Sequence, residues 1–127
     1  MYDPASYAGL WQRAFWTTQA IEIPIYLLVF HLSPAFPKWS SQTQPLSFPL
    51  SWFCAFWASA LTHPFVWYFF PRVLPGYFEA VAVSEAFAVL TEALWLAFCG
   101  VRRPLLWSFL ANLASASFGF ARHYLLS

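Results

Sequence analysis

Long apolar runs divide the chain into four blocks, at residues 7–30, 48–70, 77–98 and 105–126. Each block is close to the roughly 20 residues that a helix needs to cross the hydrocarbon core of a bilayer. Proline, charge and short polar stretches separate the blocks. Strands of a membrane barrel would instead alternate apolar and polar residues. The pattern therefore predicts an all-α, polytopic membrane protein with about four transmembrane helices.

The links between the blocks differ in length. Residues 31–47 form the long connection and contain the only lysine, Lys38. The other two links are short, and Gly100 and Pro104 are placed to end the third helix and to start the fourth. Because short links favour antiparallel neighbours, we predict an up-down four-helix bundle that forms one membrane domain over residues 1–127.

The composition supports a membrane protein and limits the kinds of molecule that the chain is expected to bind. The chain is 61% hydrophobic and 9% charged, whereas an average soluble domain has roughly 25% charged residues. A net charge of +1 provides no basic surface for nucleic acid. The expected partners are the lipid bilayer and either further copies of the chain or other membrane subunits. The expected location is an integral position in a membrane, with the bacterial inner membrane as the default.

Common catalytic motifs are absent from the sequence. It contains no Gly-rich phosphate loop, no HExxH and no GxSxG. Cys54 and Cys99 lie inside apolar blocks without CxxC spacing, so we interpret them as small buried hydrophobes. The sequence thus requires no cofactor and favours a role other than catalysis.

A stripe of polar or small residues runs along each predicted helix. Residues three, four or seven apart lie on the same face of a helix. We therefore expect the four stripes to face one another inside the bundle. They consist of Gln12, Gln19, Glu22 and Tyr26; Ser51, Ala55, Ser59 and Thr62; Glu85, Ala88 and Glu92; and Ser108, Asn112, Ser115 and Gly119.

The rise of about 1.5 Å per residue places several polar side chains near the centre of the bilayer. With antiparallel neighbours, Glu22, Glu92 and Asn112 are expected in one layer. His63 and Glu85 are expected in a second, adjacent layer. Pro64 removes a backbone hydrogen bond, so we also expect the second helix to bend beside His63.

Three carboxyl groups at this depth have no Lys or Arg beside them. An ionised carboxylate in hydrocarbon costs at least about 2.5–3.5 kcal/mol. Each carboxyl must therefore be protonated, or neutralised by a cation or by a partner subunit. Acids inside membranes often mark proton and ion pathways. Alternatively, they are neutral and link helices through hydrogen bonds to residues such as Gln19 and Ser115.

The leading hypothesis is transport or relay of a proton, cation or small solute through this carboxylate cluster. Its predicted binding or relay residues are Glu22, His63, Glu85, Glu92, Asn112 and Ser115. The glutamates would titrate or coordinate, His63 would be a proton partner, and Asn112 and Ser115 would orient the carboxyls.

Two alternatives come from other functional classes. In the first alternative, the chain would be a non-catalytic structural subunit of a larger membrane complex, because its long apolar faces suit covering by other helices. The second alternative is a membrane-embedded metal-dependent enzyme, with His63, Glu85 and Glu92 as the metal ligands.

Overall fold

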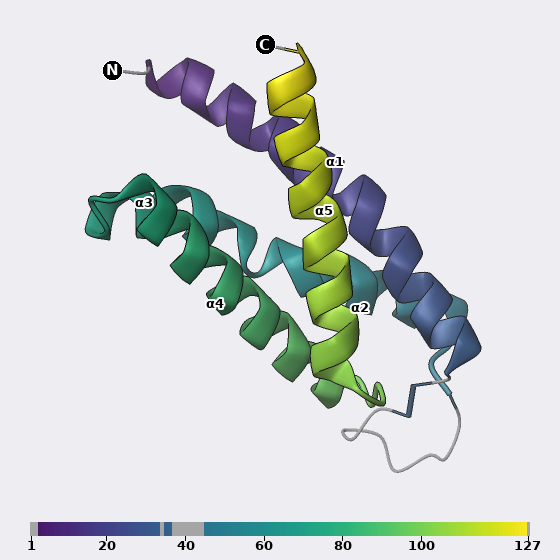
Figure 1. Cartoon of the computed structure of the whole chain (residues 1–127). Coiled ribbons are helices and arrows are strands. Elements are labelled where there is room, and N and C mark those ends of the chain that lie inside the picture. The colour runs from purple at the N-terminus through teal and green to yellow at the C-terminus, as the bar shows by residue number, and fades with distance from the viewer. Residues whose placement is uncertain (1–2, 34, 37–44, 127) are drawn as a thin grey trace.

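The computed structural model describes residues 3–33, 35–36 and 45–126. All regular structure in these ranges is helical, which confirms the all-α class for the described part of the chain (Figure 1). The elements are α1 (Pro4–Leu32), α2 (Phe48–Ala60), the π-helical segment η1 (Phe65–Phe69), α3 (Phe70–Val73), α4 (Tyr77–Phe98) and α5 (Pro104–Leu126). By length and composition, α4 and α5 are apolar enough to cross a membrane.

The predicted boundaries agree best for the third and fourth helices. The helix predicted at 77–98 coincides with α4, and α5 begins one residue before the predicted 105–126. The first helix extends beyond 7–30 at both ends. Most of the predicted loop 31–47, including Lys38, lies outside the described residues.

The prediction of one continuous helix over residues 48–70 is wrong. Helix α2 ends at Ala60, turns replace the helix at Leu61 and Thr62, and the chain then continues into the π-helical winding of η1. Pro64 supplies no N–H and its ring crowds the preceding turn, so an α-helix cannot run through this point undisturbed. The chain changes direction at the break (Figure 1). The expected bend beside His63 therefore exists, but as a full interruption rather than a kink.

A second proline explains an unusual contact between α1 and η1. Pro71 has no N–H, so the Trp67 carbonyl four residues earlier lacks its usual helical donor. The Tyr7 hydroxyl donates to this carbonyl at 2.5 Å. The start of α1 is thereby attached to the segment that follows the break.

The turn between α4 and α5 depends on glycine. The Val101 N–H donates to the Leu96 carbonyl and the Gly100 N–H to the Ala97 carbonyl, which is the Schellman pattern of a helix end. Gly100 has a φ of +89°, and a Cβ atom there would overlap the backbone of Phe36. Both the conformation and the close approach therefore require glycine, as the sequence predicted for this helix end.

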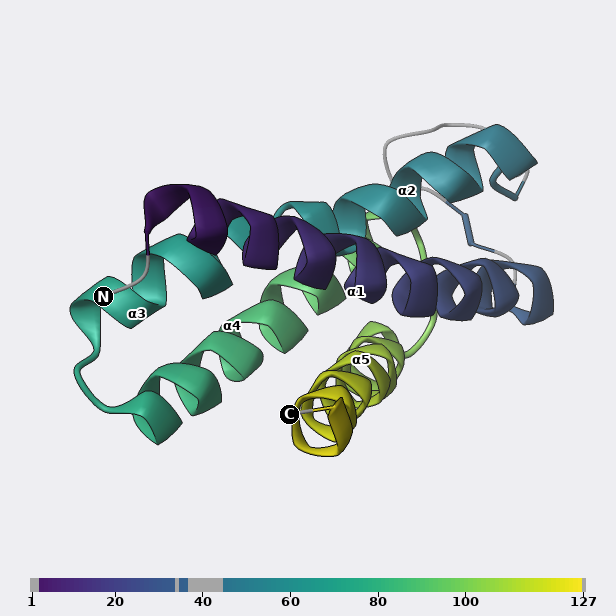
Figure 2. The ribbon, with the colours of Figure 1, turned by 90° about the horizontal axis from the view of Figure 1, so that it is seen from above.

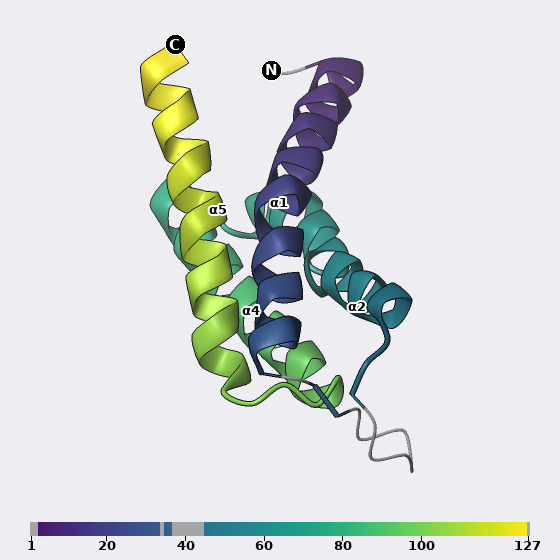
Figure 3. The same ribbon diagram turned by 90° about the vertical axis from the view of Figure 1, so that its right-hand side faces the viewer.

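Helices α1 and α4 run away from the end of the molecule that carries both chain termini, and α5 returns to it, whereas α2 lies across them (Figure 1). Helix α1 packs between α2 and α5, and α5 also packs along α4 (Figures 2 and 3). Toward the termini, α1 and α5 diverge, as Figures 1 and 3 both show. The polar stripes consequently face inward at the centre, whereas Gln12 and Gly119 at the terminal ends are exposed.

Candidate functional site

Two carboxyl groups meet in the centre of the bundle. Glu22 of α1 is 1% exposed and Glu92 of α4 is 0% exposed. The two carboxyls are direct neighbours. The stripes of α1 and α4 thus bring together two residues that are 70 positions apart in the chain.

Helix α5 supplies a donor to each carboxyl. The Ser115 hydroxyl donates to Glu22 Oε1 at 2.7 Å. The Asn112 amide donates to Glu92 Oε2 and also to the Ser108 carbonyl, the latter at 2.9 Å. Asn112 and Ser115 are three residues apart, so one face of α5 orients both acids.

The other oxygen of each carboxyl has no donor within the described part of the chain. These atoms are Glu22 Oε2 and Glu92 Oε1. The hydroxyls of Tyr26 and Ser59, which lie beside the acids, are also buried without a hydrogen-bond partner among the described residues. Helices α1, α2 and α4 therefore direct unpaired oxygen atoms into one small region.

No basic side chain of the described residues compensates the two acids. The groups that act on Glu22 and Glu92 in the described structure are each other, Glu85 and neutral hydroxyl or amide groups. Paired buried acids usually have a cationic partner or coordinate a metal. Among the described residues, this pair has neutral donors only.

Glu85 lies two turns before Glu92 on α4 and is half-buried. It is close enough to interact electrostatically with both acids of the central pair. The structure thus associates Glu85 with Glu22 and Glu92, rather than with His63 as the depth calculation predicted.

His63 occupies an aromatic environment instead. Its ring is stacked on Trp67 with centroids 6.2 Å apart and an interplanar angle of 16°. The Phe15 ring approaches edge-on at 5.3 Å, and Trp11 lies at 6.2 Å. No carboxyl contributes to the surroundings of the imidazole in the described structure. The predicted pairing of His63 with Glu85 is therefore not formed, because the break before His63 turns the ring toward α1.

The predicted metal ligands His63, Glu85 and Glu92 do not converge either. Within the described residues, no group of three or more His, Cys, Asp or Glu side chains is arranged to hold a metal ion. The observations thus provide no support for a metal-dependent enzyme.

Two buried residues beside the pair were absent from the predicted site. Tyr26 and Ser59 belong to the polar stripes of the first and second helices, so the stripe pattern already contained the signal that they face inward. The Trp95 indole also donates to the Cys54 carbonyl at 2.9 Å and joins α4 to α2. Cys54 and Cys99 are both buried as free thiols, as their apolar surroundings predicted.

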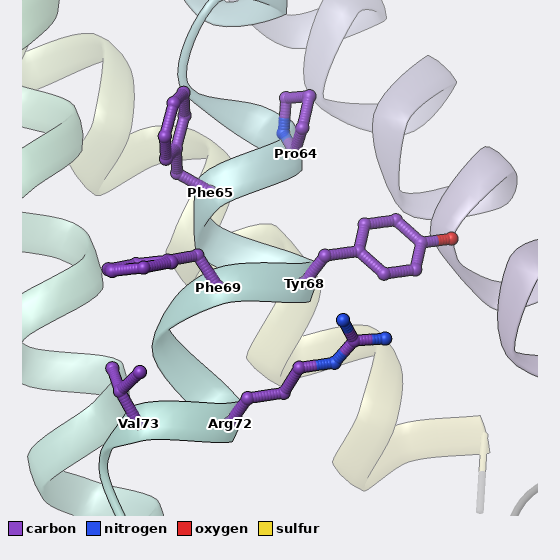
Figure 4. Close-up of a pocket in the computed structure, with 6 residues that line it drawn as sticks. All are labelled: Pro64, Phe65, Tyr68, Phe69, Arg72 and Val73. Carbon is purple, nitrogen blue, oxygen red and sulfur yellow. The ribbon is translucent and has the colours of Figure 1, made fainter.

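Two grooves of about 370 Å³ lie on the outside of the molecule. One is formed by η1 and α3, where Tyr68 and Arg72 point toward α1 and Phe65, Phe69 and Val73 point away from it (Figure 4). The other lies between α1 and α2 and includes Gln19, one turn before Glu22. Only this second groove reaches a neighbour of the carboxyl pair.

Comparison of the chain with models of protein families, with curated protein sequences and with solved structures finds no match. The function must therefore be inferred from the chemistry of the residues, above all from the buried Glu22–Glu92 pair.

Proposed function

We propose that this chain is an integral membrane protein that relays a proton or a small cation through the Glu22–Glu92 pair. The observation that carries the proposal is the burial of two adjacent carboxyls with neutral partners only. Such a pair is stable when it holds a mobile positive charge, and it changes state when that charge leaves.

The outer surface supports a membrane location. Large apolar side chains on α4 and α5 are strongly exposed, for example Phe78 at 84%, Leu94 at 73% and Leu125 at 80%. A water-facing surface rarely carries so extended an apolar area, whereas lipid is its natural solvent. The bacterial inner membrane stays the expected location.

In this proposal the first crossing is one long helix, and the second crossing is made of several short helical elements. Helix α1 is long enough, since its 29 residues correspond to about 44 Å at 1.5 Å per residue. Helix α2 has 13 residues, or about 20 Å, which is shorter than the hydrocarbon thickness of about 30 Å. The second crossing therefore needs η1 and α3 in addition to α2.

Reconstitution into liposomes with a trapped pH indicator tests the relay. The double variant Glu22→Gln/Glu92→Gln is expected to reduce proton flux to that of protein-free liposomes, because glutamine keeps the shape but cannot titrate. Glu79→Gln is the matched control, since Glu79 is exposed in the first turn of α4. Wild-type flux of protons and of Na⁺ and K⁺ in the double variant would refute the proposal.

A second candidate role, as a subunit of a larger assembly, is favoured by the end of α5. A Cβ atom added at Gly119 would meet no other atom within 4 Å, and Arg122 and His123 are exposed. Gly119 thus faces open space among the described residues, although the Arg122 guanidinium donates to the Thr17 hydroxyl of α1 at 3.4 Å. A further copy or another membrane subunit would cover this part of α5. Native mass spectrometry in mild detergent measures the mass of the assembly; a monomer would exclude this role.

A further inference from the structure

We propose that the Glu22–Glu92 pair holds a single proton, shared between Glu22 Oε2 and Glu92 Oε1. This inference deepens the proposed function, because its meaning for transport rests on that function. It specifies the mobile species as a proton and names the two atoms that carry it.

The hydrogen-bond arrangement distinguishes the two sides of each carboxyl. Glu22 Oε1 accepts from Ser115, and Glu92 Oε2 accepts from Asn112. The opposite oxygens, Glu22 Oε2 and Glu92 Oε1, lack a donor in the described structure although the two groups are neighbours. The Ser59 and Tyr26 hydroxyls lie beside the acids but make no hydrogen bond within the described residues, so we assign the missing donor to the space between the two carboxyls.

A proton on one carboxyl supplies that donor. An ionised carboxylate can only accept hydrogen bonds, whereas a protonated one also donates. Two carboxylates at close range cannot both be ionised, because like charges repel and the surroundings are dry. With one proton the pair has a charge of −1, which the donors from Ser115 and Asn112 stabilise. It also forms an O–H···O⁻ hydrogen bond, which is among the stronger kinds.

A divalent metal ion fits the same oxygens less well. Ca²⁺ takes six to eight oxygen ligands, and Mg²⁺ takes six in octahedral geometry. Two of the four carboxylate oxygens already accept from Ser115 and Asn112. No third acidic, His or Cys ligand converges on the pair in the described residues. A proton needs two oxygens only.

The polar groups next to the pair define the direction in which the proton moves. Glu85 lies two turns before Glu92 on α4, and Tyr26 lies one turn after Glu22 on α1. Since α1 and α4 both run away from the end that carries the termini (Figure 1), these groups flank the pair on opposite sides. The pair gains a second proton from one side and becomes neutral. It returns to one proton when that proton leaves on the other side.

Infrared spectroscopy of the purified protein tests the sharing directly through the C=O stretch of protonated carboxyls. Glu22→Gln and Glu92→Gln are each expected to lose the band intensity of one carboxyl, because the new amide replaces the donor and leaves the other acid ionised. The double variant is expected to lose no more than either single variant. Glu79→Gln is the control and keeps the wild-type band.

Two results would overturn the proposal. Losses that add up in the double variant would mean that each acid is protonated independently. No loss in any variant would mean that neither acid holds a proton. The wild-type band and its shift in D₂O need no variant, so a misfolded variant does not block the test. A shared proton without flux would refute the relay alone, and flux without the shared band would refute this inference alone.

Discussion

The Glu22–Glu92 pair and the His63 imidazole are both buried polar groups, yet their surroundings are built differently. The pair receives donors from Ser115 and Asn112 on a third helix. The imidazole packs against aromatic rings, and its Nδ1 has no partner in the described structure. The first arrangement couples helices through hydrogen bonds, and the second fills space.

Similar depth alone therefore does not bring two polar side chains together. The sequence placed His63 and Glu85 at similar depth, but the direction of a side chain also depends on the helix that carries it. An uninterrupted helix preserves that direction over many turns, and a broken helix does not. If the two regions differ in energy as they do in geometry, substitutions beside the Glu22–Glu92 pair cost more unfolding free energy than a substitution of His63 that keeps its ring contacts.

The largest expected effect belongs to Asn112→Leu. It leaves the buried Glu92 oxygen without its donor at nearly constant side-chain volume, so we expect a loss of unfolding free energy of about 2–3 kcal/mol. Unfolding in mixed detergent micelles measures it, with Ser117→Leu as control because Ser117 is exposed on the same helix. Equal effects of the two substitutions would contradict the assigned role of Asn112.

Ser115→Ala is expected to have an intermediate effect. It removes one hydroxyl donor to Glu22, for which a loss of about 1 kcal/mol is typical. Ser117→Ala is the matched control in the same assay. A loss larger than that of Asn112→Leu would show that the negative charge of the pair is concentrated on Glu22, which would argue against an evenly shared proton.

The smallest effect is expected for His63→Phe. Phenylalanine keeps the ring contacts with Trp67 and Phe15 and removes an unpaired nitrogen, so the unfolding free energy should change by less than about 1 kcal/mol. His63→Ala, which removes the ring, should cost more. Proton flux should be unchanged in His63→Phe. A loss of flux would restore the prediction that His63 is a proton partner.

The apolar pattern was sufficient to predict much of the fold. It located α4 and α5 closely, because an uninterrupted apolar block between proline and glycine leaves little freedom. Stripe spacing also predicted the meeting of Glu22, Glu92, Asn112 and Ser115, since helical periodicity fixes which residues share a face.

The rest of the fold and of the candidate site depends on the break in the second helix, which hydrophobic periodicity does not predict. A break at Leu61 and Thr62 changes the direction of the side chains that follow it in the second segment, and the π-helical turn of η1 adds a further rotation. Pro64 predicted a disturbance of the helix, but it did not indicate whether the helix would bend or end there. The position of His63 therefore could not be obtained from spacing, and the predicted metal ligands failed with it.

The contact between Gly100 and Phe36 has a consequence for the order in which the molecule is made. Phe36 belongs to the connection after the first helix, whereas Gly100 follows the third. During synthesis this contact cannot form until the third helix has been completed. Because the glycine leaves space for the backbone of Phe36, the contact joins the connection after the first helix to the turn between the last two. Position 100 is therefore a late point in the biogenesis of the molecule.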